Sequence, residues 1–307
     1  MSKTGPIVDQ ADKLRRIVSS LRERSEVIID RAVKKTGKKA RLIAVTSGKG
    51  GVGKTSLTVN IAIKLSKNGY RVVVIDGDLG LANVEVMLGI VPQYSMYDII
   101  NSGLSLSDVI IDGPMGIKFI SGGTGVVEMA YLDRRRFDSL LDTLSVLDSY
   151  ADFILVDTGA GISRSVTKFV LAAREVILVT NSEPTSITDA YAILKIISIH
   201  NKECYIKMIA NMVESPAEAE DILARINTAA KMFIGAEIKS LGFVKRDPAV
   251  SKAVKTQTPF IIGSPKSAAA KSIERIAQRI VYNTEYIREP EGVREFLTRI
   301  YLRMNSS

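Results

Sequence analysis

The sequence is poor in the residues that build disulfide frameworks, metal sites and histidine-based catalytic sets. Its 307 residues include no tryptophan, one cysteine (Cys204) and one histidine (His200). A single cysteine cannot form an internal disulfide and does not supply a paired-cysteine metal site. His200 ends a helix-like stretch, where a surface or capping role suits it, so no Ser-His-Asp set is predicted.

Long hydrophobic runs are also missing from the sequence. No uninterrupted apolar run approaches the roughly 18 residues that a membrane-spanning helix needs, and the N-terminus lacks the apolar stretch of a signal peptide. We therefore expect a cytoplasmic protein. Because 46% of the residues are apolar, the chain can bury a sizeable core, and we expect one main α/β domain.

Acidic residues are in the minority, and the excess positive charge is unevenly distributed. The net charge is +9, and residues 1–41 carry twelve Lys/Arg against five Asp/Glu, whereas the remaining 266 residues are nearly balanced. A basic terminal segment suits an acidic protein, nucleic acid or an anionic membrane, and it is equally compatible with a solvated arm.

The stretch VTSGKGGVGKTSL (residues 45–57) fits the G-x-x-x-x-G-K-[ST] pattern of a phosphate-binding loop. An apolar β-like run precedes it and a helical apolar spacing follows it, which is the order that the motif requires. We expect Lys54 to reach the β- and γ-phosphates and Thr55 to place its hydroxyl on Mg²⁺, while the glycines let backbone N–H groups approach the phosphates. The predicted ATP-binding residues of the loop are Gly50, Gly51, Val52, Gly53, Lys54, Thr55 and Ser56.

Short apolar β-like runs alternate with helical stretches along the rest of the chain. The predicted strands are residues 41–47, 71–76, 117–122, 152–158, 175–181, 205–211 and 238–244. Several are apolar throughout, as expected for a parallel sheet that is covered on both faces. The sequence therefore predicts a doubly wound, mostly parallel α/β sheet with its site at the carboxyl ends of the strands.

Three aspartates stand where predicted strands end. Asp76 and Asp78 follow one strand and Asp157 ends another. Carboxylates in this position beside a phosphate loop can hold Mg²⁺ or position an attacking water. Asp157 is the better candidate for the acidic residue that an apolar strand delivers towards the metal. The predicted metal-site residues are therefore Thr55, Asp157 and Asp76.

The sequence indicates the identity of the nucleotide base, and the residues that contact it, less clearly. The guanine-specific Asn-Lys-x-Asp pattern is absent, since residues 201–204 lack the Asp, and ATP is therefore favoured over GTP. Asn211 ends a late strand where a base can sit and is the predicted adenine contact. Asn181 and residues 245–250 are alternatives, and each of these fits a turn or helix cap equally well.

The loop contains a second lysine, Lys49, which a single nucleotide site does not need. The stretch KGGVGKT (residues 49–55) resembles the deviant Walker A motif of the MinD/ParA group of ATPases, and the resemblance extends over about residues 40–280. It implies a slow Mg²⁺-dependent ATPase that dimerises with ATP, with Lys49 reaching the partner's phosphates. It also implies that Asp78 positions the hydrolytic water, that Asp76 lies in the same switch region, and that Asp157 binds the water shell of the metal.

The N-terminal stretch DQADKLR (residues 9–15) narrows the family further. It resembles the DQAxxLR motif of the MinD-like flagellar number regulators, the family named FlhG, YlxH or FleN, and the matching residues are Asp9, Gln10, Ala11, Leu14 and Arg15. The resemblance implies that this helix binds the GTPase FlhF and stimulates GTP hydrolysis, with Gln10 acting near the GTP. The resemblance leaves open flagellar switch-complex proteins or a transcription regulator as further partners. An ordinary amphipathic helix docked on its own domain is the alternative.

The C-terminal stretch EGVREFLTRIYLRM (residues 291–304) is amphipathic. Its apolar face includes Phe296, Leu297, Ile300 and Tyr301. Such a helix can lie in a membrane interface, and two copies on an ATP-bound dimer would gain avidity. The same pattern also fits a terminal helix packed on the core. We expect peripheral binding to the inner face of the cytoplasmic membrane in the ATP-bound state.

Four segments are predicted from these features. Residues 1–35 form a GTPase-activating helical segment, residues 36–41 a basic linker, residues 42–284 a MinD-like ATPase domain and residues 285–307 a membrane-targeting helix. The main prediction is a switch ATPase that regulates flagellar number or placement. The alternatives are a ParA-type DNA-partitioning ATPase, against which the Gln10 motif and the apolar C-terminal helix count, and a division-site MinD. DNA is accordingly not the expected partner.

Overall fold

The computed structural model describes residues 39–78, 83–122, 132–235, 238–282 and 290–305. The predicted N-terminal helix, with Asp9, Gln10, Leu14 and Arg15, lies outside the described residues, so its role stays a prediction.

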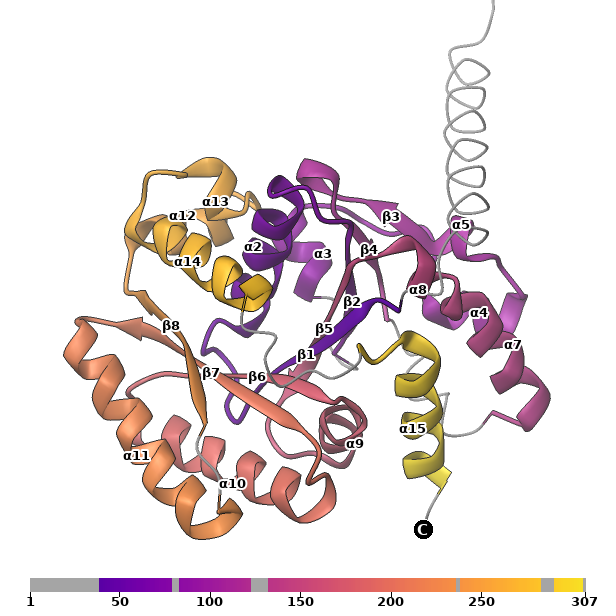
Figure 1. Ribbon diagram of the computed structural model, residues 1–307. Coiled ribbons are helices and arrows are strands. Elements are labelled where there is room, and N and C mark those ends of the chain that lie inside the picture. The colour runs from indigo at the N-terminus through magenta and orange to yellow at the C-terminus, as the bar shows by residue number, and fades with distance from the viewer. Residues whose placement is uncertain (1–38, 79–82, 123–131, 236–237, 283–289, 306–307) are drawn as a thin grey trace, which may run out of the picture.

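One mixed sheet runs through the molecule, with its strands in the order β3-β4-β2-β5-β1-β6-β7-β8 (Figure 1). All neighbours pair in parallel except β3 and β4, which are antiparallel. The strands are β1 (Arg41–Ser47), β2 (Val72–Gly77), β3 (Ile110–Asp112), β4 (Lys118–Ile120), β5 (Phe153–Ala160), β6 (Glu175–Thr180), β7 (Tyr205–Val213) and β8 (Lys239–Lys245). The predicted doubly wound, mostly parallel sheet is confirmed.

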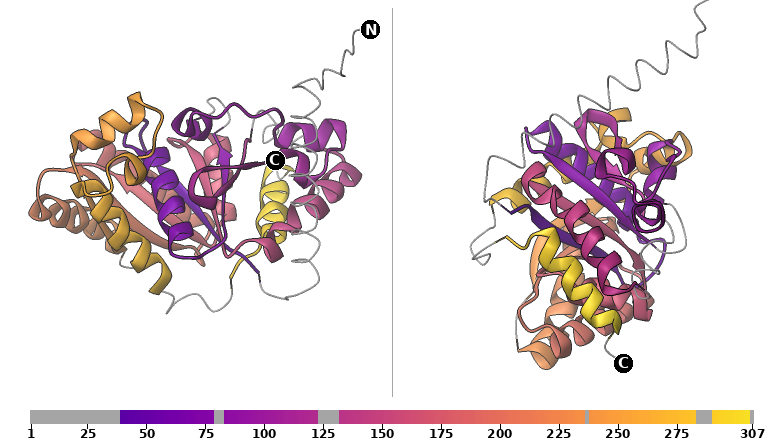
Figure 2. Two further views of the ribbon diagram at one scale, coloured as in Figure 1. Left: turned by 90° about the horizontal axis from the view of Figure 1, so that it is seen from above. Right: turned by 90° about the vertical axis from the view of Figure 1, so that its right-hand side faces the viewer.

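Helices cover both faces of the sheet, so the core has two halves (Figures 1 and 2). One face carries α2 (Lys54–Lys67), α3 (Asn83–Leu88), α12 (Pro248–Lys255), α13 (Phe260–Gly263) and α14 (Ala268–Tyr282). The other carries α4 (Met96–Ser102), α5 (Leu106–Val109), α7 (Arg134–Ser145), α8 (Leu147–Tyr150), α9 (Arg164–Ala172), α10 (Pro184–His200), α11 (Pro216–Ile234) and α15 (Val293–Asn305). This double cover explains why β1, β2 and β6 are buried along their whole length.

All seven predicted strands exist, and β3 is the strand that the sequence did not reveal. β3 is three residues long and lies at the edge of the sheet, partly exposed. So short a run has no recognisable periodicity. Its pairing with β4 depends on the tertiary structure and not on its own sequence.

In this structure the apolar face of the C-terminal helix packs on the core, which is the alternative that the sequence left open. In α15 the side chains of Phe296, Leu297 and Ile300 are 2%, 4% and 0% exposed, because they pack into the core between α7 and α9. Tyr301 is half-buried, stacks on Phe137 at 3.9 Å between ring centroids and donates its hydroxyl to the Leu132 carbonyl. Of the four residues predicted to enter a membrane, three are therefore covered in this structure and Tyr301 is half-buried.

Polar contacts also hold α15 in place. The backbone N–H of Val293 donates to Asp148 (2.7 Å), and Glu291 accepts the Arg174 N–H (2.7 Å) and pairs with Arg299 (2.6 Å). Burial raises the pKa of Glu291 to about 7, against the lowering by these donors. None of the described helices has the length and hydropathy to cross a membrane.

Candidate functional site

The phosphate-binding loop connects β1 to α2 at the carboxyl edge of the sheet. Gly53 precedes the first residue of α2 in the left-handed region (φ +86°), which favours glycine, and a Cβ there would lie 2.4 Å from Asn211 Nδ2. A Cβ on Gly48 would lie 2.4 Å from the backbone carbon of Asp189 in α10. The loop can therefore follow this path only with glycine at both positions.

Lys54 and Thr55 both contact Asp157, which is fully buried near the end of β5. Lys54 Nζ lies 2.9 Å from Asp157 Oδ1, and the Thr55 hydroxyl donates to Asp157 Oδ2 at 2.5 Å. The hydroxyl of Ser56 is buried and makes no hydrogen bond with any described residue. A cation and hydroxyls at the N-terminus of a helix fit the phosphates and Mg²⁺ of a nucleotide.

Asp76 and Asp78 lie at the end of the neighbouring strand β2. Asp76 is opposite Asp157 in the parallel register and accepts the backbone N–H groups of Asp78 (3.0 Å) and Val84 (3.1 Å). Burial raises the pKa of Asp76 to about 7, helped by the nearby Asp157 carboxylate and opposed by the N–H donors and Lys54. The structure thus brings the three predicted aspartates together at one edge of the sheet.

Asp78 is held by a side chain that the sequence did not single out. Asn83, the first residue of α3, donates from Nδ2 to Asp78 Oδ2 at 2.9 Å. A Cβ on Gly159 would approach Asp78 Oδ1 to 3.6 Å, so Asp78 faces the carboxyl end of β5. Side-chain contacts between a loop and the helix after it have no sequence periodicity, and no motif reveals them.

Lys49 has partners within its own chain. Its Nζ donates to Glu183 Oε2 (2.5 Å) and to Thr185 Oγ1 (3.0 Å) at the start of α10. Lys49 and Glu183 are 39% and 55% exposed, and Lys49 lowers the pKa of Glu183 by hydrogen bonding and charge. Lys49 therefore lies at the surface, away from Asp157, in contrast to the buried Lys54.

The residues predicted to contact the base have structural roles here. Asn211 donates from Nδ2 to the Val52 carbonyl (2.7 Å), which fastens the loop to β7. Asn181 accepts the Glu183 N–H in a turn before α10 (3.3 Å). Within residues 245–250, Asp247 accepts the Ala249 N–H and caps α12 (2.9 Å). An adenine contact by Asn211 stays a prediction.

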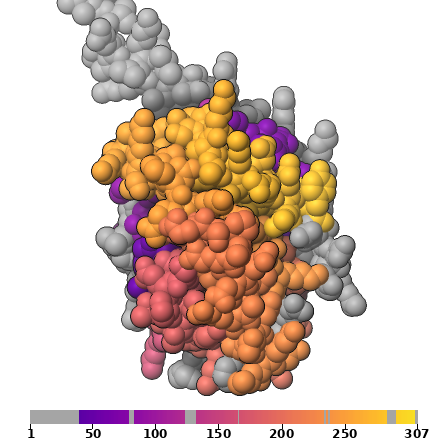
Figure 3. Space-filling view, turned by 90° about the vertical axis from the view of Figure 1, so that its left-hand side faces the viewer, coloured from indigo at the N-terminus to yellow at the C-terminus, as the bar shows by residue number. Residues whose placement is uncertain are grey.

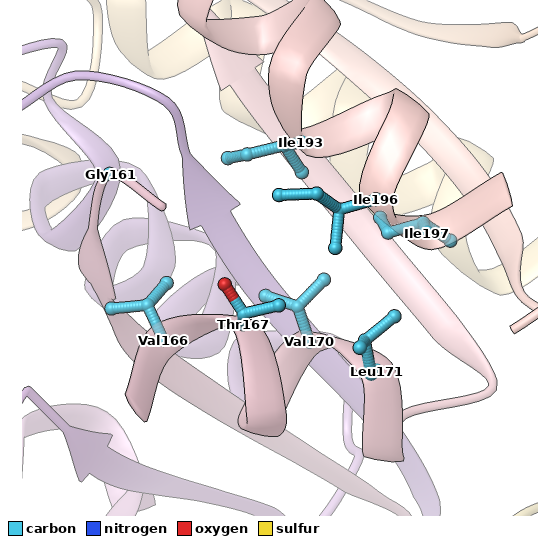
Figure 4. Close-up of a pocket in the computed structure, with 8 residues that line it drawn as sticks. All are labelled: Gly161, Val166, Thr167, Val170, Leu171, Ile193, Ile196 and Ile197. Carbon is cyan, nitrogen blue, oxygen red and sulfur yellow. The ribbon is translucent and has the colours of Figure 1, made fainter. Parts of the chain in front are cut away.

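An apolar pocket between α9 and α10 lies beside this site but offers no chemistry (Figure 4). Its lining residues are Gly161, Val166, Thr167, Val170, Leu171, Ile193, Ile196 and Ile197. The one hydroxyl among them, on Thr167, donates to the Ser163 carbonyl (2.8 Å). The described residues contain no cluster of histidine, cysteine and carboxylate side chains that would hold a metal ion by themselves.

Comparison with known proteins adds independent information to this geometry. Residues 43–260 match the model of the CobQ/CobB/MinD/ParA nucleotide binding domain. The chain is 38% identical to the antiactivator FleN of Pseudomonas aeruginosa over 78% of this chain and 86% of FleN. It is 34% identical to the flagellum site-determining protein YlxH of Helicobacter pylori over 85% of this chain and 89% of YlxH. The solved structure of the cell division ATPase MinD of Pyrococcus furiosus is similar in fold, with a TM-score of 0.62 and 25% identity over 79% of this chain and 98% of MinD.

Proposed function

The chain belongs to the CobQ/CobB/MinD/ParA nucleotide-binding family, and from this premise we propose that it is a Mg²⁺-dependent switch ATPase that controls flagellar number or placement. The observation that carries the proposal is the contrast between the two loop lysines. Lys54 is buried and forms an ion pair with Asp157, whereas Lys49 lies at the surface and forms an ion pair with Glu183. The flagellar assignment is supported by the names of the relatives FleN and YlxH and by the DQADKLR stretch.

The residues of the loop provide what ATP hydrolysis needs from the protein. Lys54 neutralises phosphate charge, and Thr55 and Asp157 hold the metal and its water shell. Mg²⁺ supplies charge stabilisation on the phosphate oxygens when it is bound. Asp78, oriented by Asn83, positions the attacking water. Asp76 fixes the start of α3 through the Val84 N–H.

Dimerisation gives Lys49 its role. Its ammonium group is partly exposed and is bound to a carboxylate that is itself half-exposed, so the pair contributes little to stability. The triphosphate of a second subunit carries more negative charge than Glu183. We therefore propose that Lys49 exchanges Glu183 for the partner's ATP when two ATP-bound copies meet face to face.

Membrane binding requires α15 to leave the core. Phe296, Leu297 and Ile300 are almost fully covered in the monomer, and they cannot enter a lipid interface from that position. We propose that the ATP-bound dimer releases α15, which then lies on the inner face of the cytoplasmic membrane. Hydrolysis reverses both steps.

The N-terminal segment acts on a second enzyme in this proposal. Residues 9–15 bind an FlhF-type GTPase, and Gln10 assists its hydrolysis of GTP. A side chain supplied by a partner can raise the rate of such a reaction by orders of magnitude, about 10³–10⁵ for arginine fingers.

The proposal is tested by measuring GTP hydrolysis by purified FlhF. The assay compares FlhF alone, with a peptide of residues 1–35, with the Gln10→Ala peptide, and with the full-length protein and ATP. We expect stimulation by the first peptide and by the full-length protein, and none by the Gln10→Ala peptide. If neither the wild-type peptide nor the full-length protein stimulates FlhF, the flagellar part of the proposal is wrong and a general MinD/ParA switch is left.

One structural observation favours the ParA-type alternative. Residues 239–279 form β8, α12, α13 and most of α14. They include nine Lys/Arg but only two Asp/Glu, and all nine basic residues are exposed. Figure 3 shows the face of the molecule on which these elements lie. The near balance of charge outside the N-terminal segment therefore includes one strongly basic edge, which the total charge does not reveal.

A basic edge of this kind binds phosphate backbones with an affinity that falls steeply with salt. The test is a binding titration on nonspecific duplex DNA at increasing salt concentration. Lys252, Lys255 and Lys271 are reversed to Glu in one variant, and Arg135, Lys202 and Arg225 in the control, so that the net charge changes equally in both. Selective loss in the first variant would support the DNA function. Equal behaviour of both variants would exclude this edge as the binding surface.

A further inference from the structure

Thr58 lies one helical turn after Lys54 on α2, outside the residues of the phosphate-loop pattern. Its side chain is fully buried, and its Oγ1 lies 3.0 Å from Asp157 Oδ1 and 3.0 Å from the Lys54 carbonyl oxygen. The hydroxyl has a single proton for these two acceptors. Because a charged carboxylate is the stronger acceptor, the geometry favours donation to Asp157.

Asp157 thus has three donors in this structure. Lys54 and Thr58 contact Oδ1, and Thr55 contacts Oδ2. Lys54 and Thr55 are also the residues that contact phosphate and Mg²⁺ in the proposed ATP site. In this structure the Asp157 carboxylate satisfies both side chains.

Nucleotide binding changes the surroundings of Asp157. When Lys54 turns to the phosphates and Thr55 to the metal, Asp157 loses two of its three donors. Thr58 is buried below the loop, one turn further along α2, and has no phosphate to turn to. Its hydroxyl is then the remaining donor of the three on a carboxylate that is 0% exposed.

We propose that Thr58 is a positioning residue that holds Oδ1 of Asp157 in the nucleotide-bound state, so that Oδ2 is directed towards the water shell of Mg²⁺. A carboxylate with no donor on Oδ1 would be free to rotate, and this change weakens the metal site. The proposal rests on the proposed ATP site and is independent of any flagellar role. It goes beyond that function because it assigns a role to a residue outside the motif.

The experiment uses the full-length protein and a fluorescent ATP analogue. Binding is measured in EDTA and over a Mg²⁺ titration for the wild type, Thr58→Val, Thr58→Ser and Thr228→Val. Valine has the shape of threonine without the hydroxyl, and serine keeps the hydroxyl. Thr228 is an exposed control for the substitution itself, because its hydroxyl also donates to the carbonyl four residues earlier in its helix, α11 (2.9 Å), and lies away from the site.

We expect Thr58→Val to raise the Mg²⁺ concentration for half-maximal binding about tenfold, the loss that removal of a hydrogen bond to a charged group produces. Binding in EDTA and the melting temperature of the nucleotide-free protein should stay near the wild-type values, because Lys54 still satisfies Oδ1 there. Thr58→Ser and Thr228→Val should behave as the wild type.

Two results would overturn the proposal. If Thr58→Val has the same Mg²⁺ dependence as the wild type, the hydroxyl does not position Asp157. If it loses binding in EDTA and stability to the same extent, Thr58 is a general support of α2. Failure of the ATP site itself is separately visible, because the wild type would then gain no affinity from Mg²⁺, and both proposals would be wrong.

Discussion

Lys49 and Lys54 belong to one loop, yet their neighbours differ in a way that separates their roles. Lys54 is 7% exposed and forms an ion pair with the fully buried Asp157, whereas Lys49 is 39% exposed and forms an ion pair with Glu183. A partly exposed ion pair is weak, with a typical contribution of about 0–1 kcal/mol. It can therefore be exchanged for a stronger anion without a large loss of stability.

The first prediction concerns Glu183. Replacing it by Gln removes the charge that competes with the partner's phosphates for Lys49, so the ATP-dependent dimer should form at a several-fold lower protein concentration. Sedimentation of the variant with a non-hydrolysable ATP analogue measures this change. Lys49→Ala should abolish the dimer, and Glu274→Gln, which removes the exposed partner of Lys64, is the control. A variant with unchanged dimerisation would show that Glu183 does not restrain Lys49.

Asp76 leads to a prediction about pH. Its pKa is raised from 3.8 to about 7 in the folded chain, chiefly by burial. The folded state therefore keeps a proton that the unfolded chain releases, and stability falls as pH rises from about 4 to 7. At ~1.4 kcal/mol per pKa unit, the effect on the free energy of unfolding is at most about 4 kcal/mol.

The N–H groups of Asp78 and Val84 bind different oxygens of Asp76, so Asp76→Asn keeps an acceptor for only one of them while it removes the titration. Denaturant unfolding of the nucleotide-free protein should show that the stability of the variant relative to the wild type is lowest near pH 4, where the lost hydrogen bond dominates, and rises towards pH 8, where the wild type carries the buried charge. Asp108→Asn, which alters a carboxylate in the exposed cap of α5, should leave the pH profile unchanged. A constant difference between Asp76→Asn and the wild type at all pH values would contradict the prediction.

At the scale of elements, the sequence predicted the secondary structure of each segment more reliably than the surface against which the segment packs. Apolar runs such as VVVID (residues 72–76) predict buried parallel strands because both faces of the strand are covered. The amphipathic pattern of residues 291–304 indicates only that one face of the helix is apolar and is buried away from water. A groove of the core and a lipid interface satisfy that pattern equally, and the packing between α7 and α9 decides between them in this structure.

The groove that holds α15 can be weakened without changing α15 itself. Phe169 of α9 packs edge-on against Phe296 with 6.0 Å between ring centroids. Phe169→Ala should destabilise the protein by about 3–5 kcal/mol and increase binding to anionic vesicles in the presence of ADP, because α15 leaves its groove more often. Vesicle flotation and thermal unfolding measure the two effects.

Phe260→Ala is the matched control for this prediction. Phe260 is 1% exposed in the core on the opposite face of the sheet, so its loss should destabilise the chain without freeing α15. Equal vesicle binding by both variants would show that general unfolding, and not release of α15, exposes the lipid-binding surface.

Across the whole molecule, the predicted site residues gather at the carboxyl edge of the sheet because consecutive parallel strands deliver their loops to one side. Sequence reasoning located the loop lysines and the aspartates Asp76, Asp78 and Asp157 for this reason. It missed Asn83, Thr58 and Glu183, because their contacts with Asp78, Asp157 and Lys49 form only in the folded chain. The basic edge on β8 and α14 was also missed, since its charges are dispersed over 41 residues of sequence.

At the opposite edge of the sheet, the residues just before β1 and at the start of α15 contact each other and α8. Asp148 in α8 accepts the N–H of Val293 at 2.7 Å, and the N–H groups of Arg294 and Ala40 also lower its pKa, against the larger raising effect of burial. Lys39, the first described residue after the N-terminal segment, forms an ion pair with Glu295 of α15. One carboxylate and one ion pair therefore connect the start of β1 with the start of the C-terminal helix.

Asp148→Asn should loosen this junction and leave the nucleotide site intact. The amide keeps one acceptor oxygen but loses the charge, and a loss of about 1–3 kcal/mol is typical for a buried polar group that loses a partner. Hydrogen exchange of residues 293–305 should become faster, while the affinity for ATP stays constant because the site lies at the other end of the strands. Asp152→Asn is the control, since Asp152 accepts from Arg71 at the same edge. If Asp152→Asn speeds exchange in α15 equally, or if Asp148→Asn weakens ATP binding, the two edges of the sheet are not independent and the junction has no separate control over α15.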